Sequence, residues 1–183
     1  MSAHLPEWSL WAPAALPMAW IILALITLQR LAELVYSNRN TGALLLRGAT
    51  EHGRSHYPAM VAIHATFLLA LWVAVRPHSA MIWPVLILVI LLQMARFWVL
   101  ATLGPYWTTR IISAPGFPRI AAGPYRFVRH PNYVVVTLEI LFIPLMFGQI
   151  VIAAAFSILN AAILYIRIRT ENEALALREK ESV

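Results

Sequence analysis

The sequence contains no cysteine and only one lysine, Lys180, among its 183 residues. The absence of cysteine excludes a disulfide framework, a thiolate metal site and a cysteine nucleophile. Charged residues are also scarce: they make up 12% of the chain, about half the usual share, whereas hydrophobic residues make up 61%. This balance excludes a disordered chain and most small soluble enzymes, and it indicates an integral membrane protein.

The net charge of +6 raises the question of a nucleic-acid partner. The arginines, however, lie mainly at the ends of apolar runs, which is the distribution that membrane topology produces. We therefore expect no nucleic-acid partner, and we also expect no metal ion.

Long apolar runs predict the membrane-spanning helices. Three runs are each near the roughly 20 residues needed to cross about 30 Å of hydrocarbon. They cover about residues 14–36, 59–75 and 80–103. We predict one transmembrane helix for each run.

A fourth apolar stretch, residues 133–167, is too long for one span, since a single helix would measure about 50 Å. Pro144 and Gly148 lie near its middle and favour a tight turn. We therefore predict a hairpin of helices at about 133–147 and 149–167, the first either tilted or crossing the membrane only in part. The whole chain, residues 1–183, is then one all-α, polytopic membrane domain with five transmembrane helices.

Connections with several basic residues alternate along the chain with connections that have one or none. The N-terminal segment and the hairpin turn have none, and the second connection has Arg76 alone. The positive-inside rule predicts an external N-terminus and a cytoplasmic C-terminus, which agrees with an odd number of helices. The rich connections are residues 37–58 (Arg39, Arg47, Arg54), residues 104–132 (Arg110, Arg119, Arg126, Arg129) and the tail (Arg167, Arg169, Arg178, Lys180).

Polar residues inside the apolar runs are costly in hydrocarbon and are therefore candidate functional groups. Arg30 and Glu33 are three residues apart on a helix and can pair with each other. Arg96 either pairs with Glu139 or extends its charged end to the membrane–water interface. Glu139 has no basic neighbour four residues away, so it needs a partner from elsewhere or lines a site. The others, which can form hydrogen bonds or line a site, are Gln29, His64, Gln93 and Asn160.

The most informative segment runs from Gly123 to Tyr133 and reads GPYRFVRHPNY. Gly-Pro predicts a turn, and Pro131 suits the first turn of the following helix. Arg129 and His130 then lie at a helix N-terminus, where the amides favour an anion. The alternative interpretation is a belt of basic and aromatic residues at the depth of the lipid headgroups.

A second polar cluster, from Arg167 to Leu175, leaves the last predicted helix. Arg167 and Glu171 are four residues apart on one helix face, and alone they would be an ordinary weak ion pair. The hairpin returns the chain to the side from which it came, so the two clusters should meet at the cytoplasmic face. Such a site suits a zwitterionic, water-soluble cofactor and a lipid-like substrate that enters from the membrane.

These segments resemble the isoprenylcysteine carboxyl methyltransferase family, and phospholipid N-methyltransferases share the pattern. The family carries an Arg-His-Pro-x-Tyr-x-Gly segment and, after a hydrophobic hairpin, a Glu-Glu pair that together frame the S-adenosylmethionine site. Here the first segment begins at Arg129 and the second includes Arg167 and Glu171. Trp107, in Leu-Gly-x-x-Trp, also matches, and the resemblance is clearest over residues 100–177, the predicted methyltransferase core.

The resemblance implies S-adenosylmethionine as the cofactor. It also implies the residues that bind this cofactor or shape its site. They are Gly123, Pro124, Tyr125, Arg129, His130, Pro131, Tyr133, Arg167 and Glu171.

The chain departs from the family pattern at two positions. Val135 replaces the glycine of the first segment, which removes a close backbone approach. Asn172 replaces the second acidic residue of the pair, with Glu173 one place later. Other segments are similar to a bacterial branch that accompanies type III polyketide synthases and O-methylates alkylpyrones or alkylresorcinols. They are residues 130–133 with Glu139 further on, residues 157–160, the ending 171–175, and residues 30–34 with 37–40.

The branch resemblance implies a long-chain phenolic or enolic lipid as the acceptor, with a prenylcysteine carboxylate as the alternative. A resorcinol hydroxyl, with an ordinary pKa of about 10, benefits from a base. Glu139 or His130 is the predicted catalytic residue. The predicted acceptor contacts are Trp107, Glu139 and Asn160.

Two other classes of protein stay open. Membrane reductases that resemble steroid 5α-reductases use NADPH and have a comparable Pro-Asn-Tyr segment. This chain, however, lacks their aromatic and basic tail and has no Gly-rich dinucleotide loop. A non-enzymatic adaptor or small transporter would not need Trp107, His130 and Glu171 to converge.

Overall fold

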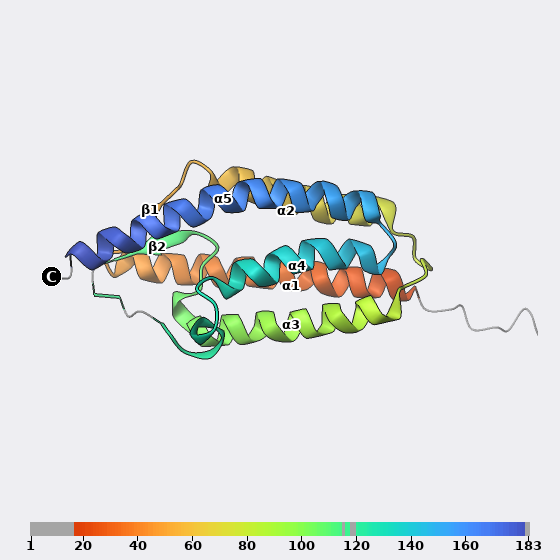
Figure 1. The fold of residues 1–183 in the computed structure, drawn as a ribbon, viewed down its shortest axis with the longest axis horizontal. Helices are drawn as coiled ribbons and strands as arrows, with labels where there is room; N and C mark the ends of the chain where they lie inside the picture. The colour runs from red at the N-terminus through yellow and green to blue at the C-terminus, as the bar shows by residue number, and fades with distance from the viewer. Residues whose placement is uncertain (1–16, 115, 118–119, 182–183) are drawn as a thin grey trace, which may run out of the picture.

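The computed structural model describes residues 17–114, 116–117 and 120–181, with side chains up to residue 176. The predicted start of the first span at residue 14 and the side chains of Arg119, Arg178 and Lys180 lie outside this description. Across the described residues the fold has five α-helices and one short two-stranded ribbon (Figure 1). The elements are α1 (Met18–Leu46), β1 (Thr50–His52), α2 (Tyr57–Ala74), α3 (Trp83–Leu103), η2 (Gly104–Tyr106), β2 (Ile111–Ser113), η3 (Gly123–Arg126), α4 (Pro131–Met146) and α5 (Ile150–Glu181).

The helices run along one long direction and form a bundle, with α3 and α5 on opposite sides of α4 (Figure 1). Four of them, α1, α2, α3 and α5, are long and apolar enough to cross a membrane. The fifth, α4, has 16 residues and measures about 24 Å, less than the hydrocarbon thickness. The prediction of an all-α protein with five helices is therefore confirmed, with α4 as the short arm. Four of the five are candidate membrane spans, and that α4 also crosses the membrane stays a prediction.

The hairpin at the far end of the bundle forms as its turn residues predict. The helix α4 ends at Met146 and α5 begins at Ile150. Between them Gly148 has φ of +71°, a left-handed conformation that favours glycine. Pro144 lies inside the last turn of α4 rather than in the turn itself.

The first helix is longer than its apolar run predicts. It continues past Tyr36 to Leu46, because the polar side chains beyond Tyr36 find partners elsewhere in the bundle. Ser37 Oγ lies 2.8 Å from Thr109 Oγ1, and Asn40 Nδ2 donates to the carbonyl of Trp107 at 2.8 Å. The predicted loop at residues 37–58 is thus partly helix.

The apolar core lies toward the hairpin end, where Leu23, Leu71, Ile143 and Met146 from α1, α2 and α4 are completely buried. Many large apolar side chains face outward instead, as expected for helices in lipid; Phe97 is 75% exposed.

All the arginine-rich connections lie at the other end of the bundle, together with the β1–β2 ribbon (Figure 1). The strands are antiparallel and pair Thr50 with Ser113 and His52 with Ile111. Arg110 of the linker before β2 pairs with Glu51 of β1 at 2.6 Å and covers the Tyr57 ring at 4.2 Å. The connections at this end are therefore polar and are fixed by hydrogen bonds and ion pairs. The first of the two cavities described below opens at this end.

Candidate active site

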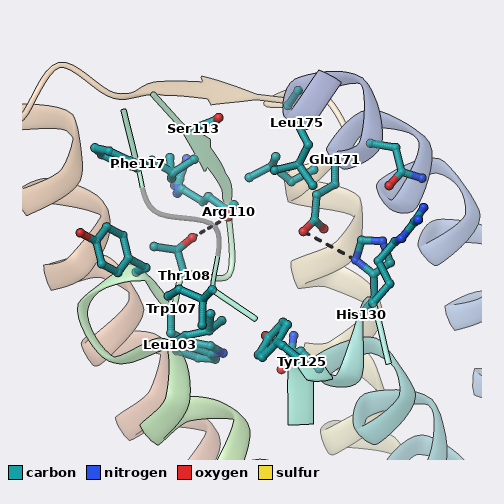
Figure 2. A pocket seen from close by; sticks show the side chains of 18 of the residues that line it. Leu103, Trp107, Thr108, Arg110, Ser113, Phe117, Tyr125, His130, Glu171 and Leu175 are labelled. Carbon is teal, nitrogen blue, oxygen red and sulfur yellow. Dashed lines mark hydrogen bonds and ion pairs between the residues drawn. The ribbon is translucent and has the colours of Figure 1, made fainter. Parts of the chain in front are cut away.

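A cavity of about 650 Å³ opens at the arginine-rich end of the bundle, between the end of α3, the segment around β2, the start of α4 and the C-terminal part of α5. Figure 2 shows His130 and Glu171 on one side of it, opposite Thr108, Arg110 and Phe117. Its wall mixes aromatic rings with polar and charged groups. The cavity can therefore hold a ligand that is partly charged and partly aromatic.

His130 and Glu171 approach each other on the same side of this cavity (Figure 2). His130 caps α4, and Pro131 starts the helix with a residue that needs no backbone N–H partner. His130 Nδ1 lies 3.8 Å from Glu171 Oε1, and the imidazole stacks on the ring of Tyr133 at 5.4 Å between centroids. Within the described ranges, His130 Nε2 is buried and has no hydrogen-bond partner. A buried ring nitrogen without a partner marks a place where a ligand or proton can be held.

Tyr133 links the two polar clusters that the sequence places 34 residues apart. Its hydroxyl donates to Glu171 Oε2 and accepts from Arg167 Nε at 2.9 Å. Arg167 also donates to the carbonyl of Thr109 at 2.6 Å. Arg167 and Glu171 therefore do lie on one helix face, as predicted, but they meet through the Tyr133 hydroxyl.

The predicted Gly-Pro turn is η3, and it carries Tyr125 into the cavity wall. Gly123 has φ of +54°, and a Cβ there would lie 2.5 Å from Thr102 Oγ1 of α3, so only glycine fits. Burial, helped by the negative charge of Glu171, raises the pKa of the Tyr125 hydroxyl above its ordinary value of 10.0. Tyr125 therefore stays protonated and can donate a hydrogen bond at physiological pH.

A second cavity, of about 260 Å³, lies deeper in the bundle between α1, α2, α4 and α5. Most of the surface that faces it is apolar, although several charged and polar side chains, Asn160 among them, also line it. The two cavities share four lining residues: Trp107, Asn132, Tyr133 and Arg167. A polar cavity at the end of the bundle and an apolar one within it thus meet at a common wall.

Beside the apolar cavity lies a buried cluster of two arginines and two glutamates, called here the ionic cluster: Arg30, Glu33, Arg96 and Glu139. Arg96 donates to both oxygens of Glu33, at 2.6 and 2.5 Å, and to Glu139 Oε2 at 3.0 Å. Arg30 reaches Glu139 Oε1 at 2.7 Å and Glu33 Oε2 at 3.1 Å. The charges cancel, and the cluster ties α1 to α3 and α4.

The ionic cluster bears on several predictions. The pairing of Arg30 with Glu33 is confirmed, and of the two alternatives for Arg96 the pair with Glu139 is the one that forms. The oxygens of Glu139 accept hydrogen bonds from both arginines and from Gln93 at 3.0 Å. Glu139 also lines the apolar cavity, so its role toward an acceptor stays a prediction.

The other predicted site residues divide between the two cavities. Tyr125, Arg129, His130, Tyr133, Arg167 and Glu171 line the polar cavity, whereas Gly123, Pro124 and Pro131 shape the turns that carry them. Asn160 is 2% exposed and donates to Thr137 Oγ1 at 3.3 Å beside the apolar cavity. His64 bonds the carbonyl of Met60 in its own helix, not a neighbouring helix.

Sequence reasoning missed some residues of the site. Asn132 lies inside the quoted motif and lines both cavities. Asn40 and Tyr36 of α1 hold Trp107, through the backbone bond described above and through a stacked pair with centroids 6.0 Å apart. Asn132 could have been found from its place between His130 and Tyr133. No local signal links Asn40 to a residue 67 positions later.

Comparison with known proteins gives two matches. The sequence profile of the "Isoprenylcysteine carboxyl methyltransferase (ICMT) family" matches residues 85–177. The chain is also similar to "Uncharacterized protein YpbQ" of Bacillus subtilis (strain 168), with 42% identity over 164 residues that cover 86% of this chain and 96% of the relative. No solved structure matches the chain.

Proposed function

Because this chain belongs to the isoprenylcysteine carboxyl methyltransferase family, we propose that it is a membrane enzyme that methylates an oxygen of a lipophilic acceptor with S-adenosylmethionine. The observation that carries the proposal is the pair of cavities, one polar and one apolar, with a common wall. A charged, water-soluble donor and an apolar acceptor need such different surroundings. The reaction needs their reactive atoms close together and aligned.

The polar cavity has the groups that this cofactor needs. S-Adenosylmethionine, when bound, supplies a methyl group on a sulfonium sulfur. Glu171 offers a carboxylate to the cofactor's ammonium group, and Arg129 offers a cation to its carboxylate. The protonated hydroxyl of Tyr125 remains for the polar edges of the cofactor, and the imidazole of His130 lines the same cavity. Tyr133 and Arg167 hold Glu171 and form the wall toward the apolar cavity.

The apolar cavity suits the acceptor. We propose a phenolic or enolic lipid, with its oxygen at the common wall and its tail among the helices. The oxygen forms a bond to the methyl carbon as the carbon–sulfur bond breaks and its electron pair stays on sulfur, and the hydroxyl proton leaves. We assign the proton acceptor to His130, whose Nε2 is free. Trp107, Glu139 and Asn160 are the proposed contacts for the acceptor.

The test is methyl transfer by the purified protein. An alkylresorcinol, an alkylpyrone and a farnesylated cysteine are each supplied with labelled S-adenosylmethionine. We expect label in the resorcinol or the pyrone. Affinity should rise about fourfold for each added CH₂ until the cavity is filled, since burying one contributes about 0.8 kcal/mol. Label in the prenylcysteine alone would refute the acceptor class and leave the methyltransferase assignment standing.

We also propose an orientation in the bacterial cytoplasmic membrane. The arginine-rich end of the bundle should face the cytoplasm and the N-terminus should lie outside. This places the polar cavity where S-adenosylmethionine is made. A C-terminal green fluorescent protein should therefore fluoresce, and a C-terminal alkaline phosphatase should be inactive. An active phosphatase fusion would contradict the orientation.

A further inference from the structure

Trp107 is held firmly at the wall between the two cavities. Its backbone N–H donates to the carbonyl of Gly104 at 3.1 Å, and its carbonyl accepts from Asn40. Its indole stacks on the ring of Tyr36 with an angle of 13° between the planes. The residue is 2% exposed, yet its Nε1–H has no hydrogen-bond partner among the residues that the structure describes. Buried indole N–H groups usually have one, so this donor lacks the partner that it would normally have.

Asn132 presents the complementary group at the same wall. It lies in the first turn of α4, directly before Tyr133, and lines both cavities. Its Oδ1 is buried and also has no hydrogen-bond partner in the described part of the chain. The wall therefore has one unpaired donor and one unpaired acceptor, and these two atoms do not bond each other.

We propose that Trp107 Nε1 and Asn132 Oδ1 together recognise a neutral hydroxyl group on the methyl acceptor. The indole N–H donates to the hydroxyl oxygen, and the Asn132 oxygen accepts the hydroxyl hydrogen. This inference rests on the proposed function, and it names the two side chains that would recognise the hydroxyl group of a phenolic or enolic lipid. Each of the two buried groups gains the partner that it lacks.

A carboxylate fits this wall poorly. It has no hydrogen to give to Asn132 Oδ1, and its negative oxygens would lie against that carbonyl oxygen. The cation among the four residues of the common wall is Arg167, and its guanidinium already has partners in the protein. Its three nitrogens contact Tyr133 Oη, Thr109 O and Met60 Sδ, the last at 2.9 Å. The pattern of unpaired groups thus selects a hydroxyl over a carboxylate.

The experiment compares lipids that differ only in the head. Native mass spectrometry of the purified full-length protein measures binding of pentadecylresorcinol, of its dimethyl ether and of a fatty acid of matched length. We expect the resorcinol to bind at least about tenfold more tightly than either of the others, because only the resorcinol satisfies both groups. W107F and N132L should each reduce this preference to about twofold or less. Trp83→Phe, which changes an indole that is 65% exposed, should keep it.

Far-UV circular dichroism of the same samples reports whether each variant is folded, and binding of S-adenosylhomocysteine is measured beside it. If N132L fails this check, W107F alone decides. Equal binding of the resorcinol and its ether by the wild type, or an unchanged preference in W107F, would overturn the inference and leave the methyltransferase proposal intact. A wild type that binds the resorcinol selectively but no S-adenosylhomocysteine would contradict the proposed function instead.

Discussion

Replacing Arg96 with methionine should lower the free energy of unfolding by about 3–5 kcal/mol. Arg96 is 6% exposed and donates to both Glu33 and Glu139. Without its charge, two buried carboxylates would share the single cation of Arg30. Truncating one member of a buried ion pair leaves such an uncompensated charge, which is costly in a low dielectric. The measurement is unfolding of the purified protein in mixed micelles of increasing sodium dodecyl sulfate.

Two further variants make this result specific to the ionic cluster. Arg39→Met removes an exposed arginine from the same helix as Arg30, and it should change stability little. The double variant Arg96→Met/Glu139→Gln removes one charge of each sign, so it should be more stable than Arg96→Met alone. An Arg96→Met variant as stable as the wild type would show that the cluster does not tie the helices together.

Replacing Glu171 with alanine should weaken S-adenosylhomocysteine binding by about 1.5–3 kcal/mol, or about 10- to 140-fold. Glu171 faces the polar cavity and His130, and we assign its carboxylate to the ammonium group of the cofactor. The expected loss of binding free energy is large because such a contact is charge-assisted and partly shielded from water. His130→Ala should act in the same direction. Isothermal titration calorimetry in detergent measures both.

The neighbouring Glu173 provides the matched control. It is exposed and is not among the residues that line the polar cavity. Glu173→Ala removes the same charge two residues away, so it separates a direct contact from a general change in electrostatic field. Affinity should stay within about twofold, since exposed charges contribute little. Normal binding by both Glu171→Ala and His130→Ala would remove the cofactor site from this cavity.

The sequence predicted the helices well where local chemistry decides. Apolar runs bounded by Pro and Gly located α2, α3 and the α4–α5 hairpin, because span length and turn residues are local properties. It did not predict the β1–β2 ribbon, whose strands have three residues each and no periodic pattern. The extension of α1 to Leu46 was also missed, because Ser37 and Asn40 are polar and their partners lie more than 60 residues away.

The site was predicted in the same uneven way. His130, Tyr133 and Glu171 stood out because they lie in two motifs that the hairpin must bring to one end. The contact between Arg96 and Glu33 was not foreseen, since it joins helices that are not adjacent in the sequence. The common wall could not be predicted for a similar reason. That Trp107 Nε1 and Asn132 Oδ1 are unpaired depends on the positions of the side chains around them, which the sequence does not give.

We propose that the polar cavity is an S-adenosylmethionine site. The most direct test is calorimetric titration of the purified wild-type protein with S-adenosylhomocysteine and, in parallel, with NADPH. We expect saturable binding of one S-adenosylhomocysteine per chain and no binding of NADPH. Binding of NADPH, or binding of neither ligand at millimolar concentration, would contradict it.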